Sequence, residues 1–237
     1  MKKFNISESV LFEDDNLYII NKPPGISTLD DRTSNLSILK FAKEYQPDSQ
    51  ICHRLDKETS GCLVIAKNPE TYRHMSIAFE KRKVNKIYHA IVDGLHEFKN
   101  TKATGPIKTL KKGIVVVDFQ DGKEALTYFD TLEAYKTHTL VACRPVTGRM
   151  HQIRVHLSFL KAPITGDESY GGRPLYLSKV KRNYNIGRDE IEKPLIQRLA
   201  LHANEISFED PKGKMTDVKA PYPKDFAVAI KQLDKNR

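Results

Sequence analysis

Asp56 stands two residues after Arg54, inside a polar segment that ends at Gly61. The apolar run 62–66 follows and predicts a buried strand. A carboxylate on a tight turn beside a strand is held stiffly, and a nucleophile or a general base needs that stiffness. Asp, Thr, Ser and Gly are also ordinary turn residues. The alternative is therefore a turn whose aspartate only accepts hydrogen bonds from backbone amides.

Arg154 is a candidate partner for this carboxylate. Residues 148–160 predict a helix because apolar side chains recur there at helical spacing: Met150, Ile153, Leu157 and Leu160. On this helix His151, Arg154 and Ser158 lie at i, i+3 and i+7, so they share a polar face. A nearby guanidinium favours the ionised form of a carboxylate and fixes its orientation. The alternative is a solvated helix face.

Residues 53–61 resemble the signature His-Arg-Leu-Asp-x-x-Thr-Ser-Gly of the RluA-type pseudouridine synthases. In that family the aspartate is the catalytic nucleophile, and it acts on a uridine of structured RNA. The resemblance implies that Asp56 is catalytic and that Arg54 fills the place of the flipped-out nucleotide. It also implies that Leu55 and Thr59 contribute to substrate binding.

Further segments match the family in the family's order. Residues 146–157 resemble a second motif, whose last arginine, here Arg154, pairs with the catalytic aspartate; residues 163–171 continue that motif. The resemblance assigns His151, in the same motif, to substrate binding. Residues 21–25 resemble a first motif that looks structural.

Two more matches concern the target base. Residues 86–94 resemble a strand whose tyrosine, here Tyr88, packs against that base and is the suspected relay for the C5 proton. Without the resemblance, an inward-facing strand aromatic is the preferred interpretation of Tyr88. Residues 198–203 resemble a late strand whose leucine, here Leu201, lines the uracil pocket.

The implied reaction breaks the N1–C1′ bond of uridine, rotates the uracil and joins C5 to C1′. Nothing is oxidised or hydrolysed, so we expect no nucleotide cofactor, no other cofactor and no metal. Whether Asp56 adds to C1′ or removes a C2′ proton stays open. Two rival functions also remain: a non-catalytic RNA-binding or ribosome-assembly protein on the same fold, and an RNA glycosidase that releases free base.

Charge supports an anionic partner. The chain has 237 residues with 39 basic and 30 acidic side chains, a net charge of +9. We expect an RNA stem-loop, ribosomal or transfer RNA, as substrate. The small RNA-binding domain that precedes the catalytic domain in many relatives is expected to be absent. A basic insertion at 173–198 is hypothesised to grip phosphates instead, through Arg173, Lys179, Lys181, Arg182, Arg188 and Lys193. Arg149 is a further candidate RNA contact.

Patterning predicts one α+β domain with a mixed sheet. The resemblance implies a single pseudouridine-synthase-like domain over 1–237, whose central mixed sheet is largely antiparallel and flanked by helices and loops. With 39% apolar residues, three cysteines and no apolar run long enough to span a bilayer, we expect a cytoplasmic monomer with reduced thiols. His53 and His202 are interpreted as hydrogen-bonding residues rather than metal ligands. The expected helices cover 34–45 (Ser34 as N-cap), 68–83 and 148–160; residues 99–114 are expected to form a loop. The expected strands are 10–14, 17–21, 62–67, 86–93, 123–134, 139–144, 199–208 and 215–220.

Overall fold

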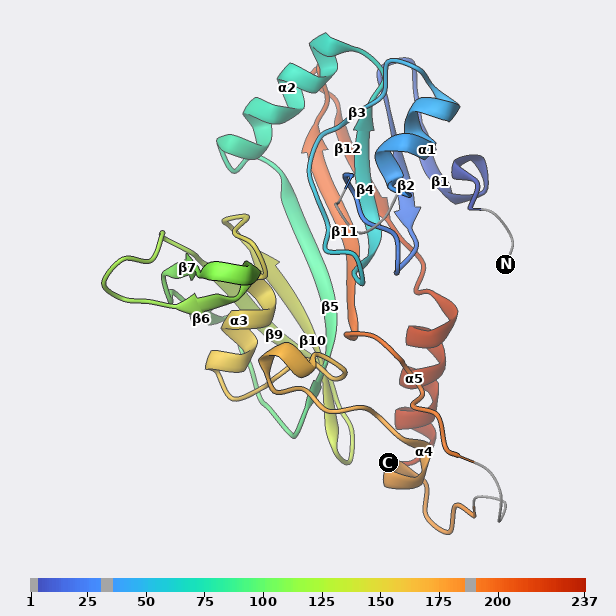
Figure 1. Ribbon diagram of the computed structural model, residues 1–237, viewed down its shortest axis with the longest axis vertical. Coiled ribbons are helices and arrows are strands. Elements are labelled where there is room, and N and C mark those ends of the chain that lie inside the picture. Colours follow the sequence, from blue (N-terminus) through green and yellow to red (C-terminus); the bar gives the residue numbers. More distant parts are fainter. Residues whose placement is uncertain (1–3, 31–35, 186–190) are drawn as a thin grey trace. The chain divides into compact units, whose positions relative to one another are not determined.

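The computed structural model describes residues 4–30, 36–185 and 191–237. Contacts divide the chain into two compact units (Figure 1). Unit 1 comprises 1–87 and 202–221, and unit 2 comprises 88–201 and 222–237.

The strands of unit 1 form a mixed sheet. β4 pairs antiparallel with β2 and β3, β2 with β1, and β11 with β12. β4 and β11 are parallel, with His202 opposite Ser60. Among the strand pairs described within either unit, this is the one parallel pair. The mixed, largely antiparallel α+β fold is therefore confirmed. The bounds are β1 (Val10–Glu13), β2 (Leu17–Lys22), β3 (Gln50–Ile51), β4 (Ser60–Ala66), β11 (Leu201–Glu209) and β12 (Met215–Lys219).

The α-helices α1 and α2 of unit 1, both labelled in Figure 1, each begin at a side-chain cap. α1 (Ile38–Tyr45) starts after Ser37, whose hydroxyl accepts a hydrogen bond from the Lys40 amide. The expected cap Ser34 lies outside the described residues, and the helix starts later than predicted. α2 (Pro69–Glu80) has the predicted Asn68 cap and ends three residues early. The 3₁₀ turn η1 (Ile6–Ser9) precedes β1.

The core of unit 1 lies between α2 and the strands. Met75 of α2 packs with Val64 of β4, Leu17 of β2 and Phe208 of β11, and all four are almost fully buried. Every residue of β4 is buried, as its continuous apolar run predicts for a strand covered on both faces. The strand that follows the Asp56 turn is thus a rigid support.

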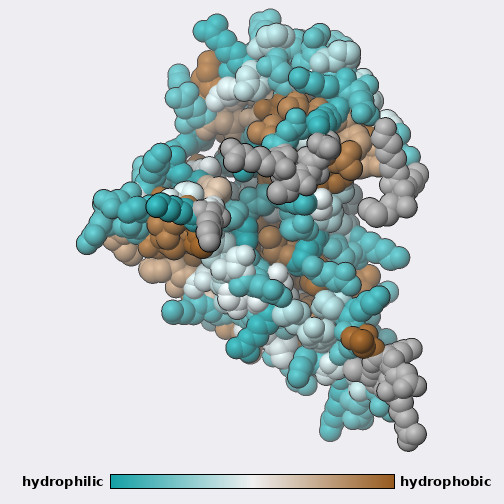
Figure 2. All heavy atoms as spheres, viewed as in Figure 1, coloured by the Kyte–Doolittle hydropathy of each residue, from teal (hydrophilic) through white to brown (hydrophobic). Residues whose placement is uncertain are grey.

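In unit 2, β5 (Asn85–Asp93), β10 (His138–Pro145), β9 (Thr127–Ala134) and β6 (Thr101–Ala103) pair antiparallel in that order. β7 (Ile107–Thr109) and β8 (Val115–Val117) form a separate hairpin around the 3₁₀ turn η2 (Lys111–Gly113). The loop expected over 99–114 is therefore wrong, because β6, β7 and η2 all lie within this segment. Figure 2 shows apolar residues gathered at the surface near this hairpin, where Phe119 and Phe159 are in contact.

The helices of unit 2 differ most from expectation. α3 (Gln152–Phe159) starts four residues later than predicted, because His151 adopts a left-handed conformation with φ 54°. α5 (Lys224–Lys235) was not predicted, although Phe226, Ala229 and Leu233 recur at helical spacing and enter the core. α4 (Leu177–Val180) and the 3₁₀ turn η3 (Glu168–Tyr170) complete the unit.

The described parts of the basic stretch, 173–185 and 191–198, also contribute to this core. Its apolar residues Leu175, Val180 and Ile196 are buried against the cluster that contains Phe129 and Leu157. Lys179, Lys181 and Arg182 therefore lie next to Val180, which is packed into the core.

Candidate active site

Asp56 lies in a tight turn, as predicted. The Thr59 amide donates to the Asp56 carbonyl at 3.0 Å, which closes a four-residue turn immediately before β4. The Asp56 side chain is partly buried. Gly61 ends the signature with φ 112°, and a Cβ there would lie 2.1 Å from the Ala203 carbonyl oxygen of β11. Only glycine therefore fits at the junction of turn and strand.

Lys22 braces the turn from the neighbouring motif. Its side chain is fully buried, and Nζ donates to the carbonyls of Pro23, Ile26 and Lys57 at 2.8–3.0 Å. The Gly25 amide donates to the same Lys57 carbonyl at 2.9 Å. The segment 21–25 was expected to be structural, and here it ties the residue after Asp56 to the end of β2. The sequence did not predict that Lys57 is the distant hydrogen-bond partner of this segment.

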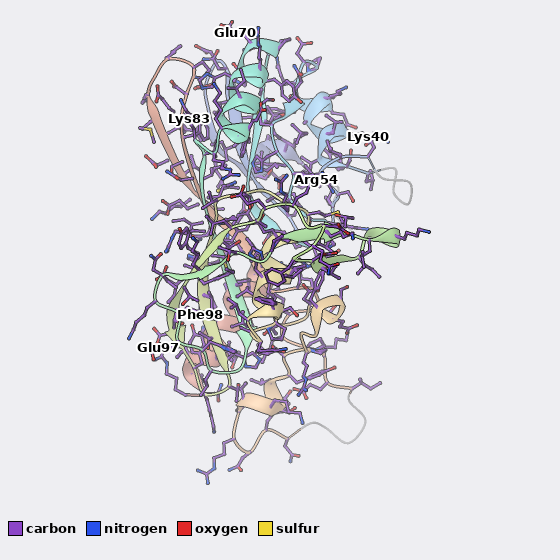
Figure 3. All side chains as sticks on the ribbon, turned by 90° about the vertical axis from the view of Figure 1, so that its left-hand side faces the viewer. Lys40, Arg54, Glu70, Lys83, Glu97 and Phe98 are labelled. Carbon is purple, nitrogen blue, oxygen red and sulfur yellow. The ribbon has the colours of Figure 1, made fainter. Side chains whose placement is uncertain are left out.

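The other predicted side chains of the signature differ in exposure. Arg54, labelled in Figure 3, is exposed and makes no ion pair or hydrogen bond through its side chain with the described residues. Leu55 is buried at 5% exposure. Thr59 is buried too, and its hydroxyl has no hydrogen-bond partner in the described part of the chain.

His53 and His202 are hydrogen-bonding residues, as predicted. His53 Nε2 accepts a hydrogen bond from the Val64 amide at 3.1 Å, so this nitrogen carries no proton. Burial, with a smaller effect of Lys86, lowers the pKa of His53 to about 3. His202 bridges Ser60 and the Ala220 carbonyl at 3.0 and 3.1 Å. Within the described ranges, no cluster of His, Cys, Asp and Glu could hold a metal ion.

In unit 2, Arg154 forms a buried bidentate ion pair with Asp167. Nε donates to one carboxylate oxygen at 2.6 Å and Nη2 to the other at 2.8 Å. Arg154 is 8% exposed and Asp167 is 2% exposed. The sequence placed Asp167 in a continuation of the Arg154 motif but did not predict their pairing.

Tyr170 of η3 contacts all three residues of the predicted polar face, namely His151, Arg154 and Ser158. Its ring lies 4.8 Å from the Arg154 guanidinium carbon, its hydroxyl hydrogen-bonds His151 Nδ1 at 2.8 Å, and its carbonyl accepts from Ser158 at 2.8 Å. The alternative of a fully solvated face is therefore wrong, because Arg154 is buried and His151 and Ser158 are partly buried. His151 contributes to this polar face from the N-cap position of α3, just before the helix begins.

Gln152 fixes the loop that leads into α3. Its amide oxygen accepts from the Thr147 hydroxyl and the Arg149 amide, while its amide nitrogen donates to Leu126 and Thr127. The Arg149 side chain is exposed and donates to the Glu124 carbonyl at 3.1 Å. The amphipathic pattern of the helix did not predict this buried polar network, because the network includes Thr127 of β9, which is distant in the sequence.

The two candidate pocket residues lie on strands. Tyr88 of β5 is partly buried, stands opposite Cys143 of β10 and packs against the core of unit 2. Leu201, at the start of β11, is buried in that core at 4% exposure.

The candidate RNA-binding residues of the basic stretch lie at the surface. Lys179 of α4 and the two residues just after that helix, Lys181 and Arg182, are exposed. Arg188 lies outside the described residues.

Comparison with known proteins agrees with the signature. The family described as RNA pseudouridylate synthase matches residues 16–159. The ribosomal large subunit pseudouridine synthase D of Haemophilus ducreyi is 33% identical over 241 residues, covering 97% of this chain and 71% of the relative. The ribosomal large subunit pseudouridine synthase C of Buchnera aphidicola is 36% identical over 233 residues, covering 94% and 70%.

A solved structure agrees as well. Human RNA pseudouridylate synthase domain containing 4 is similar with a TM-score of 0.72 and 25% identity, over 97% of this chain and 94% of that one. None of the helices in the described part of the chain has the length and apolar character that a membrane span needs.

The match to the family model and the similarity to these two relatives show what this chain is. The chain belongs to the RNA pseudouridylate synthase family, and it is an enzyme that isomerises uridine in RNA to pseudouridine.

Proposed function

We propose that the substrate is a structured region of large-subunit ribosomal RNA and that Asp56 acts on the ribose of its target uridine. The braced turn before β4 is the observation that carries the proposal, since it holds one carboxylate in a fixed backbone frame. The names of the relatives supply the RNA class. We further propose a cytoplasmic monomer in which the whole chain acts as one catalytic domain.

The chemistry needs a carboxylate facing an anomeric carbon that becomes cation-like, as in glycoside cleavage. One acid suffices, because uracil leaves as a stabilised anion and stays in the pocket. C5 then bonds to C1′ and loses its proton, for which Tyr88 is the proposed relay. Arg154 is proposed to orient the Asp56 carboxylate, and Leu201 to contact the uracil. Arg54, Leu55, Thr59 and His151 are proposed to hold the flipped nucleotide.

The direct test incubates the full chain with a large-subunit ribosomal RNA transcript and maps carbodiimide-reactive uridines. The expected result is pseudouridine at discrete positions, with unchanged RNA mass and no free uracil. Release of uracil would identify a glycosidase instead. Binding without isomerisation of ribosomal or transfer RNA would identify the non-catalytic alternative. Trapping of an RNA–protein adduct would separate the C1′ route from the C2′-deprotonation route.

We also propose that exposed basic residues of 173–198 contact RNA phosphates. Replacing Lys179, Lys181 and Arg182 by glutamine removes three cations from a segment in which Leu175 and Val180 are buried in the core. The salt dependence of RNA affinity should then weaken by about 2 to 3 in logarithmic slope. Glutamine at the exposed lysines of α5, Lys224, Lys231 and Lys235, is the matched control. Equal slopes for the two triple variants would contradict the proposal.

A further inference from the structure

Thr28 holds both backbone groups of the residue before Asp56. Its hydroxyl donates to the Leu55 carbonyl at 2.7 Å and accepts from the Leu55 amide at 3.1 Å. The Thr28 side chain is 3% exposed and Leu55 is 5% exposed, so water does not compete for these bonds. The Thr28 hydroxyl thereby pairs with the Leu55 amide and carbonyl, two buried backbone groups of a residue that lies outside the β-strands.

The residue after Asp56 is held from the same segment. The Lys57 carbonyl accepts from Lys22 Nζ at 3.0 Å and from the Gly25 amide at 2.9 Å. Residues 22–28 therefore fix the backbone on both sides of Asp56. Two bonds reach Leu55 and two reach Lys57, so the backbone at Asp56 has little freedom to shift relative to β2.

Thr28 is itself held by the first turn of α1. The Leu39 amide donates to the Thr28 carbonyl at 3.1 Å, and the Ile38 amide donates to the Ser27 carbonyl at 2.9 Å. Amides in the first turn of a helix have no partner within the helix. The chain uses two of them to anchor the segment that carries the Thr28 hydroxyl.

We propose that Thr28 is a positioning residue for the reaction at Asp56, an inference that rests on the proposed function of Asp56. A valine at position 28 has the same shape but leaves the Leu55 amide and carbonyl buried without partners. The turn would then rearrange to satisfy them and move the carboxylate. A shift of about 1 Å at a reacting group reduces rates on the order of 10²-fold.

The test compares Thr28→Val with Thr28→Ser in the full chain. Single-turnover pseudouridine formation at saturating RNA should fall about 10- to 100-fold in Thr28→Val. The RNA dissociation constant should change less than the rate, because Thr28 itself makes no proposed RNA contact. Thr28→Ser, which keeps the hydroxyl, should keep the rate within about threefold of that of the unmutated chain. Amide exchange at Leu55 should quicken in Thr28→Val and stay slow in Thr28→Ser.

Tyr18→Phe is the matched control for lost stability, since it removes the buried Tyr18–Ser49 hydrogen bond at the other end of β2. Rates are compared per folded molecule at a temperature where all variants are folded; if Thr28→Val does not fold, Thr28→Ala takes its place. A rate loss in Thr28→Val or Thr28→Ala no larger than in Tyr18→Phe would overturn the proposal. If the unmutated chain formed no pseudouridine, the proposed function would fail, and Leu55 exchange alone would still decide whether Thr28 fixes the turn.

Discussion

Arg154 and Asp167 form a two-pronged ion pair in the interior of unit 2, with contacts of 2.6 and 2.8 Å. The carboxylate fixes the plane of the guanidinium, and the Tyr170 ring lies over it. The arginine that the family assigns to the catalytic carboxylate is therefore also a buried structural residue. Its substitution will affect folding as well as chemistry, and the two effects must be separated.

Arg154→Ala should lower the free energy of unfolding by about 3–5 kcal/mol, because it leaves the Asp167 carboxylate buried and unpaired. The double variant Arg154→Met/Asp167→Leu removes both charges and should regain much of that stability. Urea unfolding measures both. If Arg154 serves the reaction, the double variant stays inactive although it folds. Recovery of pseudouridine formation in the double variant would show that Arg154 is only structural.

Arg54→Ala should reduce turnover of structured RNA more than turnover of an unstacked oligonucleotide. The exposed guanidinium has no partner among the described residues, so it is available to fill the place of a flipped nucleotide, whose unstacking costs a few kcal/mol. Comparison of kcat/KM on the two RNAs is the measurement. Arg73→Ala, an exposed arginine of α2, is the control. Equal losses on both RNAs would argue against this role.

Tyr88→Phe should keep the ring packing against the core of unit 2 and remove only the hydroxyl. If the hydroxyl relays the C5 proton, the rate of pseudouridine formation should fall about 10²- to 10⁴-fold while RNA affinity is retained. Tyr128→Phe on β9 is a matched strand control. A wild-type rate in Tyr88→Phe would restrict the role of Tyr88 to packing.

His53 should make stability depend on pH. Its pKa is lowered to about 3 in the fold, mainly by burial, whereas an unfolded histidine titrates near 6.5. Below pH 6.5 the unfolded chain binds a proton that the folded chain refuses, so stability falls as the pH drops from about 6.5 towards 3. His53→Gln should reduce the loss of unfolding free energy between pH 7 and pH 5 by about 2 kcal/mol. Urea unfolding at both pH values is the measurement, and an unchanged pH dependence would contradict the assignment.

Local features were predictable from the sequence. The turn at Asp56, the buried strand after it and the Asn68 cap of α2 all depend on neighbouring residues, and each is present. Contacts between distant segments were not predictable. Thr28 reaches Leu55, and Gln152 reaches β9, through hydroxyl and amide groups that carry no periodic signal.

Two helices of unit 2 differ from the sequence-based prediction: α3 in its start and α5 in its presence. α3 starts late because His151 leaves the helical region of φ, although Met150 fits the apolar spacing. α5 was missed although Phe226, Ala229 and Leu233 recur at helical spacing. Its many charged residues are typical of an exposed face on a helix that packs on one side.

The rate of pseudouridine formation by Asp56→Asn, on an RNA that the unmutated chain modifies, tests the central claim most directly. The substitution keeps the shape of the side chain and removes its charge. We expect no detectable product in a single turnover, with RNA affinity within about threefold and an unchanged unfolding midpoint. Product formation by Asp56→Asn at a rate within about tenfold of the unmutated chain would show that the carboxylate does not act on the ribose.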